Sequence, residues 1–327
     1  MDEFGLINKI KKTAGSSAGK LIRGIGDDCA VFSPAKNKKI LVSSDSLAEG
    51  VHFNLKYIKP ESLGKKTAAV NISDIYAMGG VPKYMLLNLG LPLKKNTVNV
   101  HKIIKSFSDY SEKHGARLIG GDTVRAGTFF LSVMVIGEAR QEEIMMRTGA
   151  KPGDRLFITG TPGESAAGLY AFENPQKCAG IKGINIMKKK HTEPEPGLSE
   201  SRAAAKSGMV TSCLDISDGI VSDAYRISEE SACAVCIEYE KLPVSKRLAA
   251  FAEKIKKVPE EFVLYGGEDY GLLFTVSGKK TDDFGAYCGK HGLRAVEIGY
   301  ISAGRGVYLD IDGKKQKADS KKTWKHF

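Results

Sequence analysis

Residues 155–172, RLFITGTPGESAAGLYAF, pass from a strand pattern to a helix pattern across one short turn. The apolar run at 155–159 predicts a buried strand, Gly160–Gly163 predicts a turn, and 164–172 predicts a helix. The same patterns recur elsewhere, with strands expected at 39–43 (KILVS) and 129–137 (FFLSVMVIG), and helices expected at 97–114 and 217–233. This alternation of strands and helices predicts an α/β fold.

The chain has 327 residues, and at roughly 150 residues per domain this length suggests two domains. The polar, turn-rich stretch at 146–154, MRTGAKPGD, is the expected boundary. We therefore predict an N-terminal domain at residues 1–145 and a C-terminal domain at residues 146–327. Hydrophobic residues make up 42% of the chain and charged residues 27%, as in ordinary globular proteins, so wholesale disorder is excluded.

Membrane, secreted and zinc-binding proteins are disfavoured by what the sequence lacks. Its longest apolar stretches, such as 129–136, are shorter than the roughly 18 residues that a membrane span needs. The N-terminal MDEFGLINKIKK has no apolar segment typical of a signal peptide. Cys233 and Cys236 have no second Cys pair, so reduced structural thiols are favoured over a zinc site. We expect a cytoplasmic protein with no membrane partner.

The net charge of +11 leaves a nucleic-acid-binding protein as an alternative, which would bind DNA or RNA with strong salt dependence. However, no helix-turn-helix, zinc finger or basic strand with interleaved aromatic residues accompanies the charge. A solvated basic surface that attracts anionic ligands is the favoured interpretation, and no nucleic-acid partner is expected.

Aspartates beside Gly or Ser recur where strands and turns are expected. We expect Asp45 at the end of a strand and Asp74 at the start of a helix. A single such Asp is usually a helix cap or a turn residue, but six separate ones fit that role less well. If they converge, they cannot all stay ionised without cations. Oxygen donors suit Mg²⁺, which in turn recruits phosphate oxygens. The six are Asp28, Asp45, Asp74, Asp122, Asp215 and Asp218.

The sequence gives weaker signals for phosphate binding and none for a general base. No P-loop is present; the amides of 160–168 can bind an anion or simply form a tight turn. Arg147, beside the expected boundary, is placed to meet a phosphate, although a lone Arg is more often a surface residue. A hydroxyl acceptor usually needs a base, whereas a phosphate acceptor is already ionised near neutral pH. The acid-rich pattern is therefore compatible with phosphate as the nucleophile.

Eight short motifs, which appear in the family's order from about residue 24 to 276, together resemble the thiamine-monophosphate kinase family. They lie at 26–30 (GDDCA), 44–45 with 50–53 (GVHF), 69–74 (AVNISD) with 77–79, 120–123 (GGDT), 147–154 (RTGAKPGD), 159–163 (TGTPG) with 165–169, 215–219 (DISDG) and 266–270 (GGEDY). The C-terminal WKHF also resembles the ending of that family. No single motif is specific, but the combination is.

This resemblance implies the aminoimidazole-ribonucleotide-synthetase fold, in which two α/β domains with mixed sheets pack together and N-terminal domains pair in a homodimer. It implies direct phosphoryl transfer from ATP to thiamine monophosphate, giving thiamine diphosphate. The implied Mg²⁺ ligands are Asp28, Ser43, Ser44, Asp45, Asp74, Asp122, Asp215 and Asp218. The implied ATP contacts are Gly121, Asp122, Arg147 and Ser217, and the implied thiamine phosphate contacts are His52, Glu268 and Trp324.

Another ATP-using member of the same superfamily, acting on a different small phosphorylated substrate, is the alternative enzyme. Hydrogenase-maturation relatives end in a functional Cys, whereas this chain ends in His326 and Phe327. Selenophosphate synthetases carry a Cys or selenocysteine in a glycine-rich N-terminal segment, and none precedes Cys29. Ser44 stands where Thr is common in the kinase family, which keeps the hydroxyl. The segment 178–198 aligns poorly, so no role is assigned to it.

Overall fold

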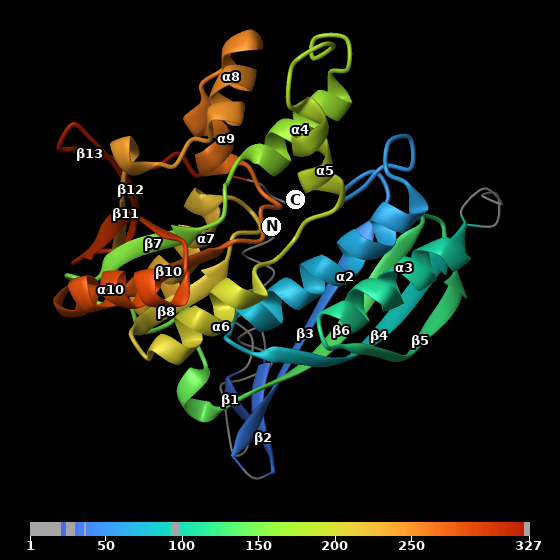
Figure 1. The fold of residues 1–327 in the computed structure, drawn as a ribbon, viewed down its shortest axis with the longest axis horizontal. Helices are drawn as coiled ribbons and strands as arrows, with labels where there is room; N and C mark the ends of the chain where they lie inside the picture. The colour runs from blue at the N-terminus through green and yellow to red at the C-terminus, as the bar shows by residue number, and fades with distance from the viewer. Residues whose placement is uncertain (1–20, 24–29, 36, 93–98, 324–327) are drawn as a thin grey trace.

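The computed structural model describes residues 21–23, 30–35, 37–92 and 99–323. Two mixed β-sheets form the framework, each with its own helices (Figure 1). The predicted α/β class with mixed sheets is confirmed. Among the described residues, no helix has the length and the apolar character to cross a membrane.

The first sheet has six strands in the order β1-β2-β3-β6-β4-β5. All neighbours in it are antiparallel except β4 and β5, which are parallel and joined through a helix, as a parallel pair requires. Its elements are β1 (Leu21–Arg23), β2 (Ala30–Ala35), β3 (Lys38–Ala48), α2 (Pro60–Ala77), β4 (Val81–Leu91), α3 (Val100–Lys113), β5 (Arg117–Arg125) and β6 (Phe130–Ala139).

The second sheet has seven strands in the order β13-β12-β9-β11-β7-β10-β8, with β9 and β12 as its parallel pair. The strands are β7 (Arg155–Thr159), β8 (Val210–Asp215), β9 (Ala234–Glu238), β10 (Leu272–Val276), β11 (Ala295–Ser302), β12 (Gly306–Ile311) and β13 (Lys314–Lys317). The helices are α4 (Glu164–Glu173), α5 (Ile184–Thr192), α6 (Leu198–Ser207), α7 (Ile220–Ser231), α8 (Lys246–Lys254), α9 (Pro259–Tyr265) and α10 (Thr281–His291). Short 3-10 turns cover Gln141–Glu143, Tyr239–Lys241 and Gly278–Lys280.

Strand β7 shows why the second sheet has continuous apolar strands. Leu156 and Ile158 pack into one hydrophobic core, while Phe157 between them packs into another with Phe274 and Phe284. Because successive side chains of a strand point to opposite faces, this sheet is covered on both sides. The predicted strand at 155–159 is confirmed residue for residue, and the helix predicted at 164–172 is α4, one residue longer.

Helix α2 lies between the two sheets and is buried along nearly its whole length (Figure 1). Its small residues permit this close packing: a Cβ on Gly64 would lie 2.1 Å from Ser106 Oγ and 2.3 Å from the Ile103 carbonyl oxygen of α3. Our expectation that Asp74 starts a helix is wrong, because Asp74 lies in the last turn of α2. A helix buried on all sides lacks the amphipathic pattern that would have revealed its extent.

Candidate functional site

Three aspartates from separate elements are joined to α2 where this helix meets both sheets. Ser43 Oγ of β3 donates a hydrogen bond to Asp74 Oδ2 of α2 at 2.5 Å. On the same helix, Ser73 Oγ donates to Asp215 Oδ2, at the end of β8, at 2.6 Å. Two residues before Ser73, Asn71 Oδ1 accepts the backbone N–H of Asp45 at 3.1 Å. We call Asp45, Asp74 and Asp215 the acidic junction, since the first half of the chain supplies two of them and the second half the third.

Successive side chains of β3 point to opposite faces of the sheet, and this decides which of the predicted ligands on the strand can lie together. Asp45 lies inside the strand rather than at its end, because β3 continues to Ala48. Ser43 and Asp45 share the face of Leu41 and Leu47, which are core residues. Ser44 is exposed and falls on the opposite face of the strand, so the structure does not place its side chain with those of Ser43 and Asp45.

The segment after β8 is held against the GGEDY segment by backbone hydrogen bonds. The N–H of Glu268 donates to the Ser217 carbonyl at 2.7 Å, and the N–H of Tyr270 donates to the Ile216 carbonyl at 2.9 Å. A Cβ on Gly267 would lie 2.4 Å from the Ser217 carbonyl oxygen, so this approach requires glycine. The predicted ATP-contacting Ser217 and the predicted substrate-contacting Glu268 are therefore parts of one packed unit.

Tyr270 lies beside the candidate site, and sequence reasoning gave it no role. Its ring is buried, and burial raises the pKa of its hydroxyl well above the ordinary range. The negative charges of Glu268, Asp215, Asp45 and Asp218 raise that pKa further, in this order of effect. Carboxylates from both halves of the chain thus lie close enough to act on one phenol, which remains protonated and able to donate a hydrogen bond.

Asp223 shapes the segment that carries Ser217 and Asp218, and it too was missed from sequence. Its Oδ2 accepts the backbone N–H groups of Ser217 at 3.1 Å and Asp218 at 3.2 Å. Burial and the nearby Asp218 carboxylate raise the pKa of Asp223 well above its usual value. The Arg226 guanidinium forms an ion pair with Asp218. The signal in the sequence was a third acid, five residues beyond Asp218 in DISDGIVSD.

The acidic junction offers donors that suit magnesium. Its donors are carboxylate and hydroxyl oxygens, the ligands that hard cations prefer. Among the residues that the structure describes, no three His, Cys, Asp or Glu side chains are grouped as a preformed metal site. Mg²⁺ is commonly bound through one or two carboxylates plus substrate phosphates, with water completing its shell. Asp45, Asp74 and Asp215 therefore fit a cation that arrives with a nucleotide.

Gly121 and Asp122 lie on β5, away from the acidic junction. Across the first sheet, Asp45 pairs with Val133, which pairs with Leu87, which pairs with Gly121. Three strand spacings correspond to about 14 Å, so Asp122 and Asp45 of the same chain are not in contact. Gly121 has φ of +152°, and a Cβ there would lie 1.8 Å from the Leu87 carbonyl oxygen. A glycine is needed for β4 and β5 to pair at this point.

The remaining predicted residues lie at the junction of the halves or outside the described chain. The Arg147 carbonyl accepts hydrogen bonds from Ser212 Oγ at 2.7 Å and Ser231 Oγ at 3.0 Å, which fixes the segment linking the sheets. The ring Nδ1 of His52 accepts the backbone N–H of Ala48 at 3.1 Å. Asp28 and Trp324 fall outside the described residues.

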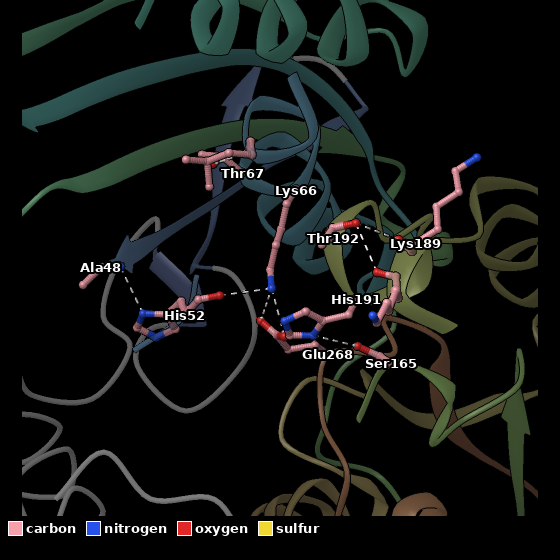
Figure 2. A network of polar contacts seen from close by, with 11 residues as sticks. Ala48, His52, Lys66, Thr67, Ser165, Lys189, His191, Thr192 and Glu268 are labelled. Carbon is pink, nitrogen blue, oxygen red and sulfur yellow. Dashed lines mark hydrogen bonds and ion pairs between the residues drawn. The ribbon is translucent and has the colours of Figure 1, made fainter. Parts of the chain in front are cut away.

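Glu268 belongs to a polar network that also contains Lys66 and His191 (Figure 2). Burial alone would raise the pKa of the Glu268 carboxyl, but Lys66 and His191 more than offset it and lower the pKa to about 2. Burial, together with the charge of Lys66, lowers the pKa of His191. Glu268 is therefore a fixed negative charge beside a neutral His191 at neutral pH.

Two family models match the chain: "AIR synthase related protein, N-terminal domain" at residues 26–139 and "AIR synthase related protein, C-terminal domain" at residues 151–312. The thiamine-monophosphate kinase of Buchnera aphidicola subsp. Acyrthosiphon pisum is 37% identical, over 99% of this chain and 98% of that protein. The thiamine-monophosphate kinase of Escherichia coli K12 is 35% identical, over 95% of this chain and 92% of that protein.

Comparison with a solved structure points to the same family. The structure described as AaThiL complexed with AMPPCP and TMP superposes with a TM-score of 0.85 at 35% identity, covering 100% of this chain and 97% of that one. The sequence match and the structural match thus both extend over essentially the whole chain. The chain belongs to the AIR synthase related family and, within it, to the thiamine-monophosphate kinases.

Proposed function

We propose that this protein transfers the γ-phosphoryl group of ATP to thiamine monophosphate, giving thiamine diphosphate and ADP. The observation that carries the proposal is the acidic junction, where Asp45, Asp74 and Asp215 from both halves of the chain are gathered around the end of α2. A full-length structural relative was solved with AMPPCP, an ATP analogue, together with TMP. Two phosphorylated ligands require a site that tolerates several negative charges.

The acidic junction would hold Mg²⁺, with Asp28 and Asp218 as further proposed ligands. Bound Mg²⁺ supplies positive charge that neutralises the phosphates of donor and acceptor. The chain's own contribution is orientation: the hydroxyls of Ser43 and Ser73 each bind one oxygen of a carboxylate. Each carboxylate is thereby oriented by a hydroxyl on a regular element, Asp74 by Ser43 of β3 and Asp215 by Ser73 of α2, rather than by a loop. Such fixed placement keeps the cost of reorganisation low when charge develops.

The nucleotide and the substrate would both bind next to this junction. Gly121, Asp122, Arg147 and Ser217 are the proposed ATP contacts. His52, Glu268 and Trp324 are the proposed contacts of thiamine monophosphate. Because Nδ1 of His52 is an acceptor, the hydrogen of the neutral ring lies on Nε2, where it can donate to a phosphate oxygen. The ionised Glu268 suits the cationic ring of thiamine, and an aromatic face such as that of Trp324 suits the same cation.

We further propose transfer in line, without a phosphoenzyme and without a general base. The acceptor is a phosphate oxygen that is already ionised near neutral pH, so no proton has to be removed from it. In-line attack needs the two phosphates aligned and their repulsion neutralised, which is a task of positioning and electrostatics. The rigid elements β3, α2 and β8 that carry the acidic junction are suited to it.

A homodimer paired through the first sheet, acting in the cytoplasm, is also part of the proposal. Large apolar side chains are exposed on β4, β5 and β6, among them Tyr84, Ile119, Val124 and Met134. Clusters of exposed apolar residues mark interaction surfaces. Pairing of two such sheets would cover them. Sedimentation equilibrium should give twice the chain mass of 35.3 kDa, and a strictly monomeric protein would refute this part.

The experiment that tests the function measures ADP release with thiamine monophosphate, thiamine or an aminoimidazole precursor as acceptor. We expect magnesium-dependent turnover with thiamine monophosphate alone and formation of thiamine diphosphate in equal amount. Turnover with the aminoimidazole precursor instead would identify a different member of the superfamily. Release of ADP without phosphorylated product would show an ATPase and would contradict the proposal.

A further inference from the structure

Lys66 is a buried cation at the contact between the two halves of the chain. It lies on α2, and its side chain is 0% exposed. Its Nζ lies 2.8 Å from Glu268 Oε1, and it donates hydrogen bonds to Glu268 Oε2 at 2.9 Å and to the His52 carbonyl at 3.1 Å (Figure 2). An ammonium group has three N–H donors, so these three acceptors use its full capacity.

Through these bonds one side chain joins two residues that both belong to the proposed thiamine monophosphate site. His52 belongs to the turn after β3 in the first half, and Glu268 to the GGEDY segment in the second. The ring of His52 is tied to Ala48, so fixing its backbone carbonyl also fixes where the ring lies. The distance between His52 and Glu268 is therefore set by Lys66 rather than by either loop alone.

His191 supplies a second support for Glu268, from α5. Its Nδ1 lies 2.9 Å from Glu268 Oε2, and its side chain is 3% exposed. Glu268 has φ of +61°, a left-handed conformation that side chains other than Gly seldom adopt. Its own side chain is 23% exposed, whereas those of its two supports are buried. The Glu268 carboxylate is thus held by two buried side chains, while part of its own surface remains open to a ligand.

We propose that Lys66 is a positioning residue for thiamine monophosphate, holding His52 and Glu268 at the separation that the substrate requires. This inference rests on the proposed function. Lys66 itself cannot contact the substrate because it is wholly buried. Nor is stability a sufficient reason for it, since a buried ion pair is often no better than apolar residues of the same volume. The contribution of Lys66 is instead to fix the position of His52, in the first half of the chain, relative to Glu268, in the second half.

The test replaces Lys66 by Met, which keeps much of its volume and removes the ammonium. Lys65→Met is the matched control: Lys65 is the neighbouring residue of α2, is 40% exposed, and binds Glu193 rather than Glu268. Steady-state kinetics are measured with thiamine monophosphate varied at saturating ATP, and then with ATP varied. For Lys66→Met we expect KM for thiamine monophosphate to rise about 10- to 100-fold, the scale of a lost charge-assisted hydrogen bond. KM for ATP should stay unchanged, and Lys65→Met should behave as the wild type.

The split between the two KM values separates positioning from a merely structural role. A structural role would reduce the fraction of active protein, which lowers kcat and leaves both KM values as they were. That result, or an equal rise in both KM values, would overturn the inference. If Lys66→Met does not fold, His191→Phe tests the same geometry, with a rise of roughly tenfold in KM for thiamine monophosphate expected and an unchanged KM refuting it. A wild-type protein that does not phosphorylate thiamine monophosphate would instead refute the proposed function itself.

Discussion

Replacing Asp215 by Asn removes one negative charge from the acidic junction while keeping its shape. Asp215 is 4% exposed and accepts a hydrogen bond from Ser73 Oγ at 2.6 Å. The Asn side-chain oxygen can accept the same bond, so we expect the free energy of unfolding to change by about 1 kcal/mol or less. In catalysis, losing one preorganised charge from a site that stabilises phosphoryl transfer costs about 3–4 kcal/mol, or roughly 10²- to 10³-fold in kcat.

The assay is ADP release at saturating ATP and thiamine monophosphate, over a series of Mg²⁺ concentrations. Asp154→Asn is the matched control, because Asp154 is also buried in the second half of the chain and also accepts a hydroxyl hydrogen bond, from Thr211 at 2.7 Å. We expect Asp154→Asn to keep its turnover and Asp215→Asn to lose it with the fold intact by circular dichroism. Near-normal turnover of Asp215→Asn would refute the role given to the acidic junction.

Two further predictions concern packing and pH. Gly64→Ala should lower the free energy of unfolding by about 1–3 kcal/mol, measured by urea titration, because its Cβ would lie 2.1 Å from Ser106 Oγ; an unchanged or higher stability would contradict the close packing of α2 on α3. Burial raises the pKa of Asp269 to about 7, although the N–H of Gly163 donates to it. Because this folded-state pKa lies above the unfolded value, the stabilisation from Asp269 is present at low pH and is lost as the pH rises toward 7. Asp269→Asn should flatten the wild-type fall in stability between about pH 4 and pH 7, and parallel pH profiles would contradict this assignment.

Local patterns in the sequence were sufficient to predict much of the fold. The predicted strand at 155–159 is β7, and the helix predicted at 97–114 is α3 at Val100–Lys113, because its apolar stripe packs on one face only. The strand predicted at 39–43 extends to Ala48, since its polar residues after Ser43 interrupt the apolar run without ending the strand. The position of helix α2 was predicted least well, because all of its faces are buried and it has no amphipathic pattern.

The site could be predicted only in part because its geometry depends on contacts between distant segments. Sequence motifs predicted Asp74 and Asp215 as ligands, and the hydrogen bonds from Ser43 and Ser73 explain how each carboxylate is oriented. By contrast, Lys66 looked like one of many basic residues, since its partner Glu268 lies 202 positions away. Asp122 shares the motif pattern of the other acids, but the strand order of the sheet separates it from them. Periodicity and residue propensity describe local sequence, so they do not predict contacts between residues that lie far apart along the chain.

We propose that carboxylates from both halves of the chain bind one set of divalent cations together with the nucleotide. Titration of Mn²⁺, followed by electron paramagnetic resonance in the presence of AMPPCP, measures this directly on the wild type and on Asp45→Asn, Asp74→Asn and Asp215→Asn. We expect each substitution to weaken or remove tight Mn²⁺ binding, with the protein still folded. Wild-type Mn²⁺ binding in all three variants would contradict it.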